Sequence, residues 1–191
     1  MSRAGAGKTA FLVDIALDDL MQERKVLHIN IDNPVEKVRK FYDEIFNDLA
    51  DSLKLERRER AHLIVERHRL IQTYGRESFS MEKVKTGIAL AKEHMLFDPE
   101  VIILDGWPKF SEATDADIQE LVDLAKQYDC ELWVSARARR EDDRDERGIP
   151  TKIARFDEKL AVIIQLEPES DHIKLNLVKD HDNEDVASLF L

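Results

Sequence analysis

Two kinds of hydrophobic pattern alternate along this chain. Short apolar runs rich in β-branched residues are typical of strands, and they lie at 25–31, 69–74, 100–106 and 131–135. Between them, apolar residues recur every three or four positions, which predicts helices over about 10–23, 33–49, 56–68, 80–95 and 114–125. Four consecutive apolar residues, Val101–Leu104, favour a central strand that is buried on both faces. The alternation predicts an α/β fold with a mostly parallel central sheet flanked by helices.

Capping residues place the starts of three helices. Asn33 is the expected N-cap of the second helix, with Pro34 at its first position and Glu36 completing a capping box. Ser80 is the expected cap of the fourth helix, and Thr114 or Asp115 opens the fifth. The face of the fourth helix that we expect to be buried consists of Val84, Ile88, Ala91 and Met95.

The C-terminal part of the chain has a different pattern. Residues 136–150 hold five Arg and five acidic residues, so this segment is charge-neutral, and its simplest interpretation is a mobile, solvated loop. A short helix is expected near 151–158. Strands are expected at 161–166, 172–179 and 186–191, with turns between them that make them antiparallel. No repeat or linker interrupts the sequence, so we predict a single domain over 1–191.

Composition narrows the classes of protein to consider. Hydrophobic residues make up 43% and charged residues 36% of 191 residues, which indicates a globular domain with its own core. We expect a cytoplasmic protein, because we see no signal peptide and no apolar run near the roughly 20 residues of a membrane span. A single cysteine, Cys130, excludes an internal disulfide and is interpreted as a small buried hydrophobe. The formal charge of −11 disfavours nucleic acid as a partner.

The candidate chemistry begins at Gly5-Ala6-Gly7-Lys8-Thr9. A phosphate-binding loop needs glycines so that successive backbone N–H groups turn towards phosphate oxygens, and the helix that follows adds its N-terminal amides. Lys8 is expected to contact the outer phosphates, and the Thr9 hydroxyl to bind Mg²⁺. The leading glycine of the pattern is replaced by Ser2, and only Met1 precedes it, so the first strand is apparently missing. We expect that this chain starts late relative to its full gene product.

Three polar residues are expected at the same edge of the sheet as this loop. Ligands of parallel sheets bind at the carboxyl ends of the strands, where Asp32, Asp105 and Ser135 fall. Asp105 is the second expected Mg²⁺ ligand. Asp32 either orients an attacking water or is a solvated acid that caps the next turn. Ser135 either senses the γ-phosphate or caps a backbone amide.

These motifs resemble the RecA-like P-loop ATPases, and within them the branch of the DnaB helicases and KaiC. Residues 3–11 are similar to the Walker A segment of that branch, and 101–105 to its Walker B strand. Softer similarity extends over 26–32, 132–137, 161–166, 175–182 and 188–190. The resemblance implies that ATP is the nucleotide. It also implies nucleotide contacts by Arg3, Ala4, Gly5, Ala6, Gly7, Lys8, Thr9, Ala10, Asp105 and Ser135.

The chain departs from the family pattern at its catalytic positions. The catalytic Glu of the family is Asp32 here, and the residue after Ser135 is Ala136 instead of Gln. The pair that the family projects into a neighbouring subunit becomes Lys179 and His181; Arg137 is a further candidate for such a contact. The sequence therefore predicts an ATP-binding protein that is a slow, Mg²⁺-dependent ATPase, working as a switch or small motor on self-association. The alternatives are a non-hydrolysing nucleotide sensor or scaffold for a partner protein, and a DNA-dependent ATPase.

Overall fold

The computed structural model of the chain describes residues 1–3, 5, 7–169, 172–181, 183 and 188–190. These residues form two compact units. We call Thr9–Trp107 with Asp123–Val134 the sheet unit, and Met1–Lys8 with Pro108–Val122 and Ser135–Leu191 the hairpin unit. Each unit is described by itself below.

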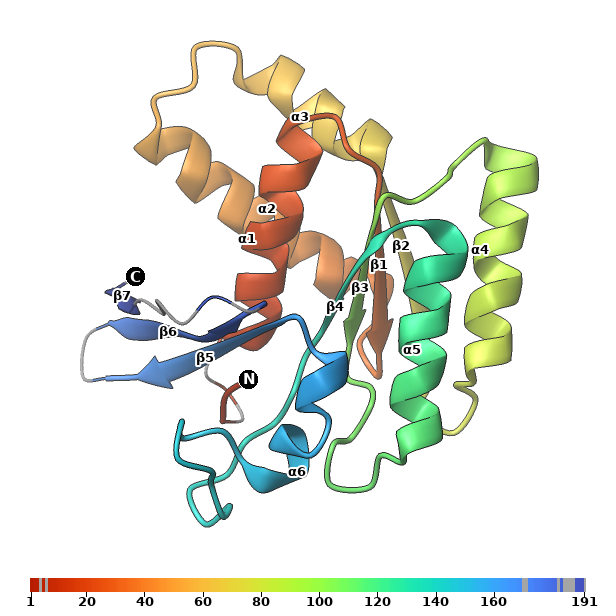
Figure 1. Cartoon of the computed structure of the whole chain (residues 1–191). Helices are drawn as coiled ribbons and strands as arrows, with labels where there is room; N and C mark the ends of the chain where they lie inside the picture. Colours follow the sequence, from red (N-terminus) through yellow and green to blue (C-terminus); the bar gives the residue numbers. More distant parts are fainter. Residues whose placement is uncertain (4, 6, 170–171, 182, 184–187, 191) are drawn as a thin grey trace. The chain divides into compact units, whose positions relative to one another are not determined.

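The sheet unit contains a four-stranded parallel sheet in the order β2-β1-β3-β4 (Figure 1). Its strands are β1 (Val26–Ile31), β2 (Arg69–Tyr74), β3 (Val101–Asp105) and β4 (Glu131–Val134). In the register of the two central strands, Val26 pairs with Val101 and Asn30 with Asp105. Every residue of β1 and β3 is buried, as the unbroken apolar run in β3 predicted.

Helices cover both faces of this sheet (Figure 1). One face carries α1 (Lys8–Met21), α2 (Val35–Ser52) and α3 (Arg58–His68), and the other carries α4 (Met81–Met95). The first face buries the apolar stripe of α2 against α1 and the central strands. Its fully or nearly fully buried members are Leu12, Val13, Ala16, Leu17, Leu20, Val26, Val38, Tyr42, Phe46, Ala50, Val65, Val101 and Ile103. Burying a side chain of the size of Phe46 stabilises the fold by about 1.5–3 kcal/mol.

Two local expectations in the sheet unit were wrong. The N-cap of α2 is Pro34 rather than Asn33, whose side-chain amide instead donates to Asn30 Oδ1 at 2.8 Å. Met95 is 61% exposed, because α4 ends at that residue and the following Leu96 turns the chain with a φ of 53°. Ser80 caps α4 as predicted, since its hydroxyl accepts a hydrogen bond from the Lys83 amide at 3.3 Å.

The hairpin unit is built around an antiparallel sheet in the order β5-β6-β7. Its strands are β5 (Val162–Pro168), β6 (Ile173–Asp180) and β7 (Ser188–Phe190), and a short α6 (Thr151–Ala154) and a 3₁₀ turn (Asp157–Lys159) precede them. Helix α5 (Asp115–Tyr128) begins in this unit and ends in the sheet unit. The three C-terminal strands are therefore as predicted from the sequence.

The residues that precede the glycine loop are extended and paired on both sides. Ser2 forms an isolated parallel bridge with Arg137, with its amide 3.0 Å from Ala136 O. On the other side, the Leu166 amide donates to Met1 O at 2.9 Å. No strand is assigned among the described residues of 1–7, yet the backbone there makes the pairings of one.

No helix in the described part of the chain combines the length and the hydropathy that a membrane span requires.

Candidate functional site

The centre of the candidate site is a contact between two residues that are 96 positions apart. The Thr9 hydroxyl donates a hydrogen bond to Asp105 Oδ2 at 2.6 Å. The Asn30 amide donates to the same oxygen at 3.1 Å. Asp105 is only 7% exposed, so its carboxylate is held by two donors at the buried end of β3. The sheet unit thus brings the hydroxyl and the carboxylate predicted for Mg²⁺ into direct contact.

Parallel pairing explains how these residues meet. β1 and β3 are hydrogen-bonded neighbours in which Asn30 lies opposite Asp105. The chain leaves β3 through Gly106, whose φ of +105° is available to glycine at little cost. A Cβ at Gly106 would lie 3.2 Å from Ile31 Cβ, so the close approach to β1 also favours glycine.

The chemistry of these donors fits a hard cation. A hydroxyl and a carboxylate oxygen are the ligand types that Mg²⁺ prefers, and the ion would be held by Thr9 and Asp105. When bound, Mg²⁺ neutralises the charge of nucleotide phosphates. Asn30 would keep the second donor to Asp105 and so fix the orientation of the carboxylate.

The loop residues of the hairpin unit have the conformation that phosphate binding requires. Gly5 and Gly7 have φ values of 75° and 78°, in the left-handed region. The Lys8 ammonium donates to Arg3 O at 2.8 Å and to Ser2 Oγ at 3.4 Å. Thus, the lysine is folded back over its own loop. Ala10 continues α1 and is half-buried, whereas Ala4 and Ala6 lie outside the described residues.

Asp32 is bound to an arginine from the segment after β2. Its Oδ1 accepts the Arg76 amide at 2.8 Å and its Oδ2 accepts Arg76 Nε at 2.7 Å. The residue follows β1 with a φ of 74°, and its side chain is 44% exposed. In this conformation Asp32 caps a turn, which is the second of the two interpretations given above. Its proposed role in orienting water remains a prediction.

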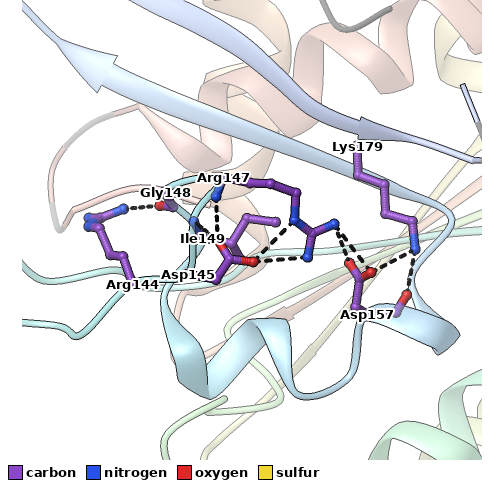
Figure 2. A network of polar contacts seen from close by, with 7 residues as sticks. All are labelled: Arg144, Asp145, Arg147, Gly148, Ile149, Asp157 and Lys179. Atoms are coloured by element: carbon purple, nitrogen blue, oxygen red, sulfur yellow. Dashed lines mark hydrogen bonds and ion pairs between the residues drawn. The ribbon is translucent and has the colours of Figure 1, made fainter. Parts of the chain in front are cut away.

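The residues expected to contact a neighbouring subunit differ in their surroundings. Lys179 is folded into its own unit, where its ammonium lies 2.6 Å from Asp157 O and 3.4 Å from Asp157 Oδ2 (Figure 2). His181 is exposed, and its Nδ1 lies 3.0 Å from Asp180 Oδ1. Arg137 is exposed. Ser135 is half-buried and directly follows β4.

The charged segment 136–150 is cross-linked within the hairpin unit (Figure 2). Asp145 Oδ1 accepts the amides of Arg147 and Ile149, and its Oδ2 accepts Arg147 Nε and Nη2. Arg147 Nη1 continues to Asp157 at 3.2 Å, and Asp157 also binds Lys179. Although burial opposes it, hydrogen bonding from Ile149 and Arg147 holds the pKa of Asp145 below its usual value. The segment is therefore not the loosely solvated loop that its composition suggested.

A polar cluster next to the site was not predicted from the sequence. His28 is fully buried on β1, with its Nδ1 3.0 Å from the Tyr42 hydroxyl and its Nε2 without a hydrogen-bond partner among the described residues. The Arg69 guanidinium lies 4.5 Å from the centre of the Tyr42 ring. Burial lowers the pKa of His28 to about 4, and Arg69 lowers it further while Asp105 opposes the shift. His28 is thus neutral at pH 7. The sequence signal was the alternation of His28 and Asn30 with Leu27, Ile29 and Ile31 inside an otherwise apolar strand.

Comparisons with known proteins identify the fold. No family model and no curated protein matches this sequence. Among solved structures, the chain is similar to the ATPase domain of a DnaB-family helicase, with a TM-score of 0.62 and 14% sequence identity over 100% of this chain and 78% of that one. This similarity supports a RecA-like P-loop ATPase fold, as the resemblance of the motifs implied.

Proposed function

We propose that this protein binds ATP with Mg²⁺ and hydrolyses it slowly, as a switch or small motor that self-associates. The observation that carries the proposal is the 2.6 Å contact between Thr9 Oγ1 and Asp105 Oδ2. A threonine at the start of a helix after a glycine loop, in contact with the acid that ends a buried strand, is the oxygen pair that P-loop enzymes use for Mg²⁺.

The roles of the residues follow from their chemistry. Lys8, next to Thr9 in α1, supplies a mobile positive charge to the outer phosphates. Thr9 and Asp105 hold Mg²⁺ through oxygen. The left-handed Gly5 and Gly7 let the loop amides turn towards phosphate oxygens.

The state of Asp32 supports a slow enzyme. Both of its carboxylate oxygens accept hydrogen bonds from Arg76, so turnover requires that this pair opens or that another group orients the water. General-base catalysis contributes roughly 10²–10⁴-fold to a hydrolysis rate, which is the scale of what the enzyme lacks while the pair stays closed.

Phosphate release with matched binding measurements tests the proposal. We expect slow, Mg²⁺-dependent release by the wild type and background release by Lys8→Ala. Asp32→Asn should lower the rate without lowering ATP affinity, whereas Thr9→Val should weaken Mg²⁺-dependent ATP binding. If wild type, Lys8→Ala and Asp32→Asn all release phosphate at the background rate, the protein is not an ATPase.

The alternative function is a nucleotide sensor that does not hydrolyse ATP and binds a partner protein. The closed Asp32–Arg76 pair favours it, because it leaves no carboxylate oxygen without a donor for a water. Tight ATP binding without hydrolysis by the wild type would support the sensor. Light scattering with and without ATP separates the two: growth in mass supports a self-assembling ATPase in which Lys179, His181 or Arg137 contacts a neighbour. A DNA-dependent ATPase would require stimulation by single-stranded DNA, which the charge of −11 disfavours.

A further inference from the structure

A group of metal-ligating side chains lies in the sheet unit, on helices that the proposed nucleotide chemistry does not use. Asp43 comes from α2, and His62 and Glu66 come from α3. One ligand atom from each of the three lies within 4.8 Å of the other two. His62 and Glu66 are four positions apart on α3, so they face the same side of that helix. His62 Nε2 lies 3.7 Å from Asp43 Oδ1, across the gap between the helices.

We propose that Asp43, His62 and Glu66 form a binding site for a first-row divalent transition metal of the zinc type. An imidazole with two carboxylates suits zinc better than magnesium or calcium, which prefer oxygen ligands alone. Ligand bonds of about 2.0–2.1 Å place tetrahedral donors roughly 3.3 Å apart, so the site closes by small side-chain rotations. Three protein ligands leave a fourth position for water.

Neighbouring side chains hold two of the ligands in position. The ring of His62 packs edge-on against Phe46 of α2, with 5.3 Å between the ring centres. Glu66 Oε1 is bound by the guanidinium of Arg69, whose side chain is buried. A carboxylate has two oxygens, so Glu66 Oε2 remains for the metal while Oε1 keeps Arg69. Arg39, which lies 3.6 Å from Oε2, is the cation that the metal must displace.

The site would cross-link α2 to α3. Metal that binds only the folded state raises the midpoint of thermal unfolding to an extent set by its affinity and concentration. The site is independent of the nucleotide function, because neither helix contributes a residue to the pair of Thr9 and Asp105.

Titration of the full, chelator-treated chain with Zn²⁺, followed by calorimetry and thermal unfolding, tests the proposal. We expect one Zn²⁺ per chain and a rise in the unfolding midpoint. We also expect a Co²⁺ absorption spectrum without the thiolate band that ligation by Cys130 would give. Asp43→Asn and His62→Gln should each weaken Zn²⁺ affinity about tenfold or more, because replacing even an outer-shell partner of a metal site costs about 10–100-fold.

Matched controls separate this site from weak binding elsewhere. Asp48→Asn changes an exposed acid on the same helix as Asp43, and His94→Gln changes an exposed histidine on α4. Both controls, and Asp105→Asn, should bind Zn²⁺ like the wild type. The proposal is overturned if the wild type binds no Zn²⁺, or if Asp43→Asn and His62→Gln bind it as tightly as the controls do.

Discussion

The buried histidine of β1 predicts a specific dependence of stability on pH. The groups that face His28 are Tyr42 from α2, Arg69 from β2 and Asp105 from β3. Its pKa falls from an ordinary 6.5 to about 4 in the folded protein, chiefly because the ring is desolvated. Between these two values the unfolded chain binds a proton at His28 and the folded chain does not. Stability therefore rises with pH across this window.

The size of the effect follows from the width of the window. A difference of one pKa unit corresponds to about 1.36 kcal/mol, so a window of 6.5 to about 4 corresponds to roughly 3 kcal/mol. This stability is fully present above pH 6.5 and is lost progressively as the pH falls towards 4. Below about pH 4 the folded state also takes up the proton, and the loss levels off.

Urea unfolding of the wild type and His28→Gln between pH 4 and 8 measures this contribution. Glutamine does not titrate, so the free energy of unfolding of the variant should lack the part of the slope that belongs to His28. The variant can also lose the hydrogen bond to Tyr42, worth about 1 kcal/mol, but that loss is the same at every pH. Parallel curves for the two proteins would refute the assignment, as would a His28 ring that NMR finds protonated at pH 5.5 in the folded state.

Three further outcomes are expected. Asn30→Ala removes a donor to Asp105 and should weaken Mg²⁺-dependent ATP binding several-fold by calorimetry, whereas an unchanged affinity would contradict its positioning role. Burial, with nearby acidic residues, raises the pKa of the Cys130 thiol to about 11 from 9.0, so its reaction with a thiol reagent should be on the order of 100-fold slower than that of an ordinary thiol; reaction at the ordinary rate would contradict this. Asp157→Asn weakens the links to Arg147 and Lys179 and should speed amide hydrogen exchange in 136–150, where unchanged protection would show that the network does not hold the segment.

Much of the fold could be predicted because the local signals agree with one another. The apolar run of β3 specified a strand buried on both faces, and Ser80 specified the start of α4. The contact between Thr9 and Asp105 could also be expected. Parallel strands deliver their carboxyl ends to one edge of a sheet, whatever the distance in sequence.

The remaining features depend on tertiary contacts that leave no local signal. Asp32 ends a strand in either interpretation, but its binding to Arg76 depends on the path of the chain after β2, which no periodicity encodes. Asn33 satisfies a common capping pattern, yet its side chain bonds to Asn30, since that buried amide oxygen needs donors. The charge balance of 136–150 suggested solvation, because a count of charges does not reveal that Asp145 and Arg147 bind each other.

The polar residues of β1 explain how a parallel sheet of nearly uniform apolar strands keeps one register. Strand residues two apart face the same side, so Val26, His28 and Asn30 share the face that packs against α1 and α2. His28 bonds to Tyr42 of α2, and Asn30 bonds to Asp105 of β3. A slip of one residue would move both polar groups into the opposite apolar layer without partners, at a cost of about 1–3 kcal/mol for each group. The same pairing that fixes the register therefore holds the Asp105 carboxylate against Thr9, so the precision of the candidate Mg²⁺ site is a consequence of how β1 packs.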